Sequence, residues 1–196
     1  YGLFGAEAFA REHPWMESAV LVFNFEAQGP QGPVYLFETT SGNWPLLQHW
    51  QRAAGYTRGD SIGAAVYDQL NFDNDFRIFK ESGLAGLGFA AIADMAYYHS
   101  AKDSLARLNL DTLAQQGSYA LAAAQYFGDI DLPLKNDPGN AVYFNFGPWL
   151  FIYPESWSQP LAAVISVLAL AVFLWGAASK RVPFKGTITA AFVHGL

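Results

Sequence analysis

A run of 19 residues without a charge, from Pro160 to Ala178, constrains this chain more than any other feature of its sequence. As an α-helix the run would extend about 28 Å, close to the thickness of a bilayer's hydrocarbon core. Tyr153 and Trp157 precede it and Trp175 lies near its end, where aromatic side chains prefer the membrane–water interface. A buried core helix is the alternative, but the run is long for a soluble core and has no polar stripe. The sequence therefore favours a transmembrane helix.

The charges are unevenly divided on the two sides of this run. Residues 1–155 carry 8 Lys and Arg against 17 Asp and Glu, whereas the charges that follow are Lys180, Arg181 and Lys185. The positive-inside rule therefore predicts that the basic loop 179–186 is cytoplasmic. Residues 1–155 would then be extracytoplasmic, in a periplasm or an organelle lumen. The nearly charge-free tail 187–196 is typical of the start of a second membrane span.

The composition of the 196 residues excludes several classes of protein. The net charge of −6 argues against a nucleic-acid-binding protein, which needs clustered cations. The absence of cysteine excludes disulfide scaffolds, thiol nucleophiles and thiolate zinc sites. The chain opens at Tyr1, already inside a helical pattern, and ends within an apolar segment. We therefore expect it to be part of a longer protein.

Residues 1–155 show the alternation of helices and strands that is typical of an α/β domain with a largely parallel sheet. The aromatic stretch over residues 136–158 is predicted to be a linker between this domain and the membrane helix, residues 159–178. Apolar runs and turn signals predict helices over Leu3–Glu12, Trp44–Ala54, Asp75–Glu81 and Leu110–Phe127, and strands over Ala19–Phe25, Val34–Glu38 and Leu84–Ala91.

Two residues are candidates for chemistry because open α/β sheets bind ligands at the carboxyl ends of their strands. Glu26 directly follows one predicted strand, and His99 lies in the loop after another. A carboxylate and an imidazole are suitable zinc ligands. Taken alone, however, a strand-end Glu is more often a solvated carboxylate, and a loop His is more often an ordinary surface residue. The sequence contains no local metal motif such as H-E-x-x-H.

A competing motif is Gly59–Gly63, which matches the G-x-S-x-G pattern of serine hydrolases with Ser61 as the nucleophile. Asp75 or Asp94 followed by His99 would complete the order Ser, Asp, His. That motif requires a buried strand leading into the serine, and the residues before Gly59 read as a helix end and a polar turn. We therefore interpret Gly59–Gly63 as a loop.

An ordered set of short stretches resembles the aminopeptidase Y-type family of two-zinc exopeptidases, and in particular its membrane-bound branch. No single stretch is decisive, but together they follow the family order along nearly the whole chain. They are Gly2–Ala6, Asn24–Ala27, Asn74–Phe79, Tyr98-His99 with Asp103, and Ala141–Phe144 leading to Tyr153-Pro154.

The resemblance implies a fold and a set of site residues. The fold would be part of a three-layer α/β/α zinc-exopeptidase sheet over residues 1–135, followed by the transmembrane helix. Glu26 and His99 match ligands of two different metal ions. Tyr98 matches a tyrosine that steadies the tetrahedral intermediate, and Asp75 matches an acidic residue that orients a ligand. The family's first His, bridging Asp, ligand Glu and catalytic Glu all precede the position that matches Tyr1.

The implied activity is zinc-dependent hydrolysis of peptides by an exopeptidase of aminopeptidase type, with two zinc ions in the complete site and with peptides and the lipid bilayer as partners. Two alternatives stay open at this point. One is a non-catalytic, receptor-like homologue that uses the same fold for binding. The other, less favoured, is a serine hydrolase that uses Ser61.

Overall fold

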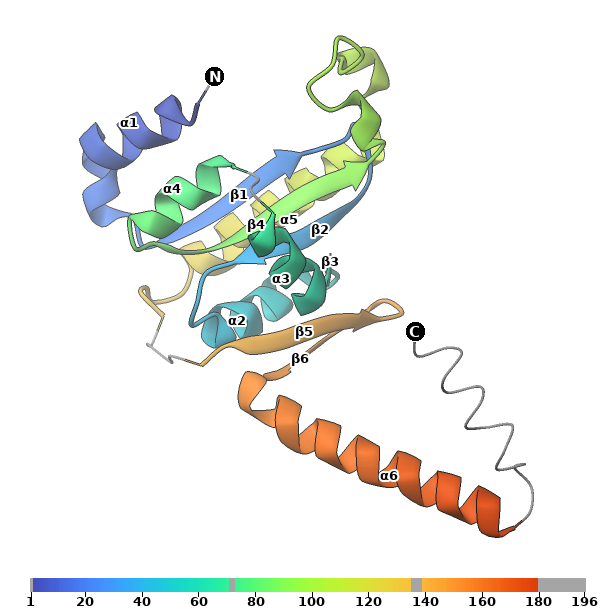
Figure 1. The fold of residues 1–196 in the computed structure, drawn as a ribbon. Coiled ribbons are helices and arrows are strands. Elements are labelled where there is room, and N and C mark those ends of the chain that lie inside the picture. Colours follow the sequence, from blue (N-terminus) through green and yellow to red (C-terminus); the bar gives the residue numbers. More distant parts are fainter. Residues whose placement is uncertain (1, 71–72, 135–138, 180–196) are drawn as a thin grey trace. The chain divides into compact units, whose positions relative to one another are not determined.

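The computed structural model describes residues 2–70, 73–134 and 139–179, which fall into two compact units. The first unit ends at Glu155 and the second begins at Ser156. Figure 1 shows the elements of both units. The predicted basic loop with Lys180, Arg181 and Lys185, and the predicted second span over residues 187–196, lie outside the described residues.

The first unit is built on a four-stranded sheet with the strand order β1-β4-β2-β3 (Figure 1). Its strands are β1 (Leu21–Ala27), β2 (Gln31–Thr39), β3 (Arg58–Gly59) and β4 (Ala85–Ala93). β1 is parallel to β4 and β3 is parallel to β2, but β2 is antiparallel to β4. The sheet is therefore mixed, and the prediction of a largely parallel sheet is wrong for β2. Only three residues separate β1 from β2, whereas a parallel connection needs a crossover of about a dozen.

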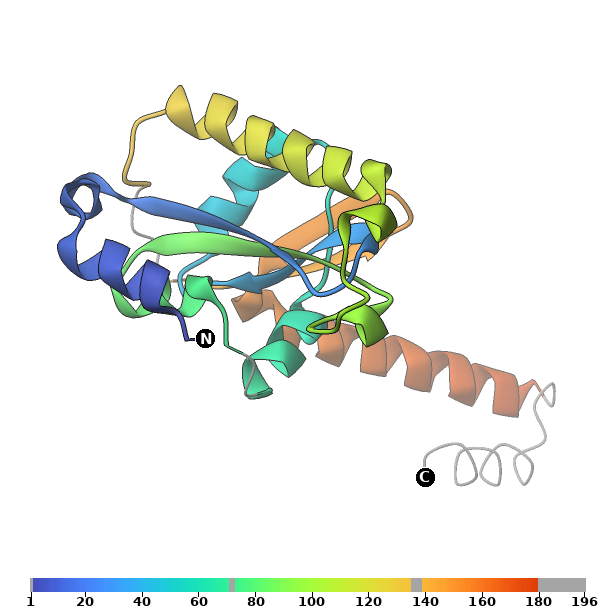
Figure 2. The same cartoon turned by 90° about the horizontal axis from the view of Figure 1, so that it is seen from above.

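Helices cover both faces of the sheet, which confirms the predicted three-layer α/β/α fold (Figure 2). α2 and α5 cover one face. α4 and α3 cover the other, and α1 packs on α4. Their bounds are α1 (Phe4–Glu12), α2 (Trp44–Ala54), α3 (Ser61–Gln69), α4 (Asp75–Glu81) and α5 (Leu110–Gly128). Asparagine side chains cap α4 and α5, since Asn74 accepts from the Arg77 amide and Asn109 from the Thr112 amide.

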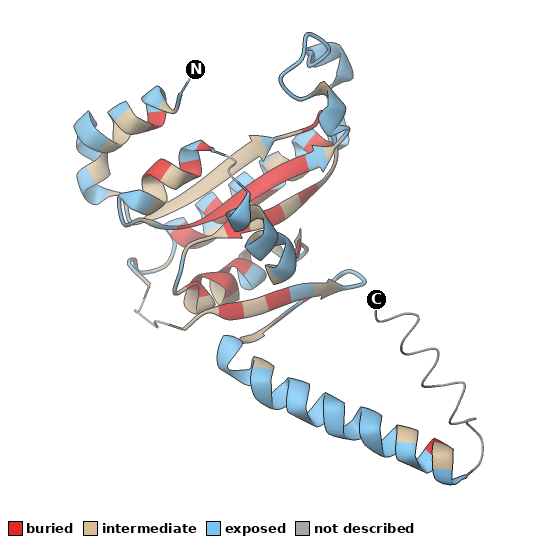
Figure 3. Ribbon diagram, in the orientation of Figure 1, coloured by how far each residue is buried: buried red, intermediate tan, exposed pale blue. Residues whose placement is uncertain are grey.

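The hydrophobic core lies between the sheet and the α2–α5 layer. Trp50 of α2 is fully buried against Phe89 of β4, with ring centroids 4.8 Å apart, and against Tyr119 of α5 at 5.6 Å. β4 is the most deeply buried strand, because it is central and covered on both faces (Figure 3). The core therefore fixes β4 rigidly, and with it the point at which the loop containing His99 leaves the sheet.

Residues within the predicted juxtamembrane linker form a folded part of the domain instead. β5 (Ala141–Phe146) and β6 (Trp149–Pro154) pair as an antiparallel hairpin. Gly147 (φ +60°) permits the tight turn between them. Tyr143 and Leu150 are buried in the core, so the domain extends to the end of the hairpin rather than stopping at residue 135.

The second unit contains α6 (Ser158–Ala178), 21 residues long and almost entirely exposed. Among the described residues it is the one helix that is long and apolar enough to cross a membrane, with a mean hydropathy of 2.4 over its most apolar 18 residues. The low share of buried side chains, 6%, argues against the alternative of a soluble core helix.

Candidate functional site

Glu26 lies near the carboxyl end of β1, opposite Ala90 of β4. The sequence predicts Glu26 as the first residue after the strand. It is instead the penultimate residue of the strand. Its carboxylate Oε1 accepts a hydrogen bond from Asn24 Nδ2 at 3.0 Å, and its backbone carbonyl accepts from Gln116 Nε2 at 2.6 Å. The side chain is half-buried and its backbone is fixed from α5, so the carboxylate is well positioned at this edge.

His99 lies in the segment that leaves the carboxyl end of β4. This segment contains η2 (Met95–Tyr97) and η3 (Leu105–Arg107) and protrudes beyond the sheet (Figure 1). His99 is exposed and has a left-handed backbone with φ +54°, which is uncommon for a residue with a side chain. Its ring stacks on Tyr98, with centroids 3.8 Å apart and planes 20° apart. β1 and β4 are parallel neighbours, so Glu26 and His99 belong to the same edge of the sheet.

Asp75 is the first residue of α4 and is exposed. A short turn joins α4 to β4, so α4 runs antiparallel to β4. Its amino end therefore points toward the carboxyl ends of the strands, where Glu26 lies. The preceding residue, Asn74, is buried and makes the helix cap. Asp75 therefore lies at the amino end of a helix, where a carboxylate is favoured.

The donor chemistry of Glu26 and His99 suits a metal, but the described residues do not complete a site. Among residues 2–70, 73–134 and 139–179, no group of three or more His, Asp or Glu side chains is close enough to hold an ion. A catalytic zinc site normally has three protein ligands. This edge can therefore supply ligands of the right kind, and further ligands would have to come from elsewhere.

A buried polar cluster that sequence reasoning missed lies under α4. Glu38 of β2 is only 7% exposed, forms an ion pair with Lys80 of α4, and accepts a hydrogen bond from Asn74 Nδ2 at 2.9 Å. The register of β2 against β4 shifts between Leu36 and Glu38. This bulge places Glu38 beside Gly88, on the α4 face of the sheet, whereas strict alternation would put it with Leu36 in the α2–α5 core.

Tyr67 of α3 lies between this cluster and Glu26. Its hydroxyl accepts a hydrogen bond from Asn74 Nδ2 at 3.1 Å, and its ring packs edge-on against Phe37. Burial raises the pKa of Tyr67, and the negative charges of Glu38 and Glu26 raise that pKa further. Phe25 stacks on Phe89 in the α2–α5 core, so the alternation of β1 places Glu26 on the opposite face of the sheet, the face that also carries Glu38.

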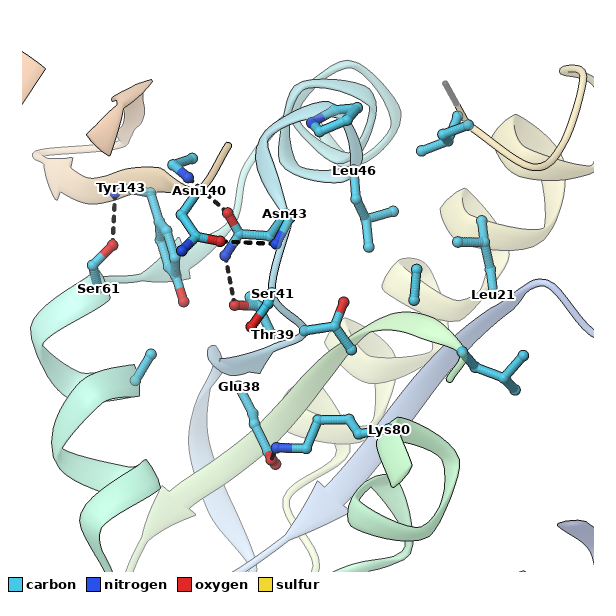
Figure 4. A pocket seen from close by; sticks show the side chains of 18 of the residues that line it. Leu21, Glu38, Thr39, Ser41, Asn43, Leu46, Ser61, Lys80, Asn140 and Tyr143 are labelled. Atoms are coloured by element: carbon cyan, nitrogen blue, oxygen red, sulfur yellow. Dashed lines mark hydrogen bonds and ion pairs between the residues drawn. The ribbon is translucent and has the colours of Figure 1, made fainter. Parts of the chain in front are cut away.

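A cavity of about 1090 Å³ lies at the other end of the sheet, where β1 and β4 begin and β2 ends. Leu21 and Ala85, the first residues of β1 and β4, line it, and so do Glu38 and Lys80. Figure 4 shows how the polar side chains around it hydrogen-bond one another. Asn43 Oδ1 accepts from the Ala141 amide at 2.7 Å, and Asn43 Nδ2 donates to Thr39 Oγ1 at 2.8 Å. These groups therefore hold the hairpin to the domain.

Ser61 belongs to this cavity, and the prediction of a loop over Gly59–Gly63 is wrong. β3 ends at Gly59, Asp60 caps the next helix by accepting from the Gly63 amide at 2.6 Å, and Ser61 is the first residue of α3. The two-residue strand was too short to leave a pattern in the sequence.

The position of Ser61 nevertheless argues against a serine hydrolase. Its Oγ accepts a hydrogen bond from the Tyr143 amide at 2.8 Å (Figure 4). Gly59 lies level with Phe89 in the middle of β4, and the chain continues from there toward the amino end of β4, whereas His99 lies six residues beyond the carboxyl end of that strand. Ser61 and His99 therefore cannot form the hydrogen-bonded pair that a catalytic triad requires.

Comparison with known proteins places the chain among peptidases. The model of Peptidase family M28 matches residues 1–124. The vacuolar membrane protease of Eremothecium gossypii is 31% identical over 180 residues, which cover 88% of this chain and 17% of that protein. The endoplasmic reticulum metallopeptidase 1 of Rattus norvegicus is 26% identical over 179 residues, covering 88% of this chain and 20% of the relative. The human protein of the same name is 28% identical over 160 residues, covering 78% and 18%.

The chain thus spans about a fifth of the length of the curated relatives it matches. No solved structure gives a significant match to it.

Proposed function

Because the chain belongs to peptidase family M28, we propose that it forms part of a membrane-anchored zinc exopeptidase of aminopeptidase type. The substrates are peptides, and the complete site holds two zinc ions. The observation that carries this proposal is that Glu26 lies at the carboxyl end of β1 and His99 in the segment that leaves the carboxyl end of β4, the parallel neighbour of β1. A carboxylate and an imidazole at that edge are the donor types that zinc takes.

Each residue of the edge has a proposed role. Glu26 and His99 each provide a ligand to a different zinc ion, and Asp75 orients a ligand from the amino end of α4. When bound, the two ions lower the pKa of a shared water and polarise the scissile carbonyl. The Tyr98 hydroxyl donates a hydrogen bond to the oxygen that becomes negative as water attacks. The remaining ligands and the general base come from other parts of the protein, so the 196-residue chain alone is expected not to bind zinc tightly.

The proposed topology places α6 across the membrane and the peptidase domain on the extracytoplasmic side. The apolar length of α6 and the membrane location in the relatives' names support the span, and the basic residues after it support the orientation. A reporter that is active only in the cytoplasm, fused after Lys185 of the full-length protein, should be active. Activity solely of a reporter that works outside the cytoplasm would reverse the orientation.

The activity is tested with the full-length protein and short peptides whose amino termini are either free or acetylated. We expect release of amino-terminal residues from the free peptides only, loss of this activity with a chelator, and recovery on addition of zinc. Activity that survives the chelator but is lost with a serine-directed phosphonate would contradict the proposal. Peptide binding without cleavage at any zinc concentration would favour the receptor-like alternative.

A further inference from the structure

The β5–β6 hairpin has two faces of opposite character. Strand pairing places three cross-strand pairs on the outer face, and these residues are half-buried or exposed. Phe146 is 69% exposed and Trp149 is 64% exposed. Phe144 stacks on Phe151 with ring centroids 5.7 Å apart and planes 16° apart. We call this outer surface the aromatic face; it consists of Val142, Phe144, Phe146, Trp149, Phe151 and Tyr153.

The inner face of the hairpin is fixed to the domain at several points. Asn145 Oδ1 accepts from the Gly59 amide at 2.8 Å, and its Nδ2 donates to the Thr57 carbonyl at 2.8 Å. Gln51 Nε2 donates to the Leu150 carbonyl at 2.5 Å. Because the inner face is held in this way, the aromatic side chains cannot turn inward by a rotation of the hairpin. Among the described residues these side chains therefore stay on the outer surface.

The chemistry of the aromatic face resembles that of a membrane interface. No charged residue occurs between Gly139 and Pro154, so no charged side chain of the hairpin opposes transfer out of water. Trp and Tyr combine an apolar ring with a polar group, and they gather where a bilayer's hydrocarbon meets its headgroups. Contiguous apolar patches on a protein surface mark sites of membrane or protein contact.

The covalent chain connects this face to the proposed membrane span over a short distance. Only η4 (Glu155–Trp157) separates β6 from α6. Four residue steps from Pro154 to Ser158 reach at most about 14 Å, roughly the thickness of one interfacial region with its headgroups. The end of the hairpin is therefore tethered close to the point at which α6 would enter the bilayer.

We propose that the aromatic face lies on the membrane that α6 crosses, with Phe146 and Trp149 inserted among the lipid headgroups and upper acyl chains. This inference rests on the proposed membrane span and goes beyond it, since a single tethering helix would leave the domain free to rotate. Two attachments, the helix and the aromatic face, would hold the domain in one orientation on the lipid surface.

The test uses the full-length protein in phosphatidylcholine vesicles and takes advantage of the absence of cysteine from this chain. Any cysteines elsewhere in the protein are replaced by serine, and single cysteines are introduced by Phe146→Cys, Trp149→Cys, Leu121→Cys and Val167→Cys. Each is labelled with the fluorophore NBD, and quenching is measured with spin-labelled lipids that carry the quencher either near the headgroup or deep in the chain. Leu121 is the matched control, an exposed apolar residue on α5.

We expect labels at residues 146 and 149 to be quenched several-fold more by the shallow quencher than by the deep one. The label at residue 121 should be quenched by neither, and that at residue 167, in the middle of α6, mainly by the deep one. Loss of quenching at residue 167 would overturn the membrane span itself. Quenching at residue 167 but not at residues 146 and 149 would overturn only the present inference. A blue-shifted but unquenched label at residues 146 and 149 would assign the face to a protein partner instead.

Discussion

The two ends of the central sheet differ in what their polar side chains are free to do. At the amino ends of β1 and β4 lies a cavity of about 1090 Å³, but the polar groups of Asn43 and Ser61 there are used in hydrogen bonds that hold the hairpin. At the carboxyl end of β4 the cavity is smaller, about 440 Å³, and neither Glu26 nor His99 lines it. Yet that end carries Glu26, Tyr98 and His99, whose side chains are half-buried or exposed.

This difference shows that the volume of a cavity does not indicate whether the residues around it can bind an ion. A large hollow lined by hydrogen-bonded side chains is a structural junction, and changes there should act on stability. An open edge with a carboxylate and an imidazole can bind an ion, and changes there should act on activity. The following substitutions are expected to separate the two ends.

The largest effect is expected at the carboxyl end. Glu26→Ala or His99→Ala removes a proposed metal ligand, and the loss of several kcal/mol of transition-state stabilisation should lower kcat/KM at least about 10³-fold. The conservative variant Glu26→Asp keeps a carboxylate and should retain part of the activity. Peptidase assays and thermal unfolding curves are measured for each variant. An alanine variant that lost stability without losing activity would contradict the assigned role of the carboxyl end.

The next effect concerns the buried ion pair that lines the cavity. Lys80→Met leaves the buried Glu38 carboxylate without its cation, and should destabilise the protein by about 2 to 3 kcal/mol with little change in kcat/KM. Lys80 itself is partly exposed, which keeps this figure at the low end for buried pairs. Thermal unfolding in detergent measures the loss, and the double variant Glu38→Gln with Lys80→Met should recover most of it. An unchanged unfolding midpoint for Lys80→Met would mean that the pair is not buried as described.

A smaller effect is expected at the junction with the hairpin. Asn43→Ala leaves the buried amide of Ala141 without an acceptor, at a cost of about 1 to 3 kcal/mol. Ser41→Ala is the matched control, because Ser41 lines the same cavity but is exposed. Both unfolding midpoints are compared with that of the wild type. Equal midpoints for the two variants would show that the asparagine does not hold the hairpin.

The smallest effect is expected for Ser61. Ser61→Ala removes the acceptor of the Tyr143 amide and should cost about 1 kcal/mol of stability while leaving kcat/KM unchanged. Ser61→Thr keeps the hydroxyl and should keep most of the stability. A loss of kcat/KM comparable to that of His99→Ala would indicate that the active site lies at the amino end of the sheet.

The helices of the domain were largely predictable from the sequence, and the sheet was only partly so. The range of α2 agrees with its prediction because an amphipathic pattern begins beside Pro45. The range of α4 agrees because Asn74 is a strong N-cap. The direction of β2 was missed, since β4, 46 residues further along the chain from Thr39 to Ala85, inserts between β1 and β2. No local pattern encodes that insertion.

The residues of the candidate site were likewise predictable only where a local sequence pattern marks them. The sequence identifies Glu26 and His99 as candidates because each lies at or after the end of an apolar strand. Glu38 was missed because one extra residue in β2 turns it to the other face, and a bulge of one residue leaves no trace in the alternation of apolar residues. The β5–β6 hairpin was read as a linker, because its outer aromatic side chains hide the period of two that marks a strand.

The most direct test of the proposed metal edge is the zinc content of the full-length protein. Wild type and the Glu26→Ala, His99→Ala and Ser61→Ala variants are purified in parallel, and zinc is counted per protein by mass spectrometry of the elements. We predict two zinc ions in the wild type and in Ser61→Ala, and a loss of at least one ion in each of the other two variants. Unchanged zinc content in both Glu26→Ala and His99→Ala would contradict the assignment of ligands to the carboxyl end of the sheet.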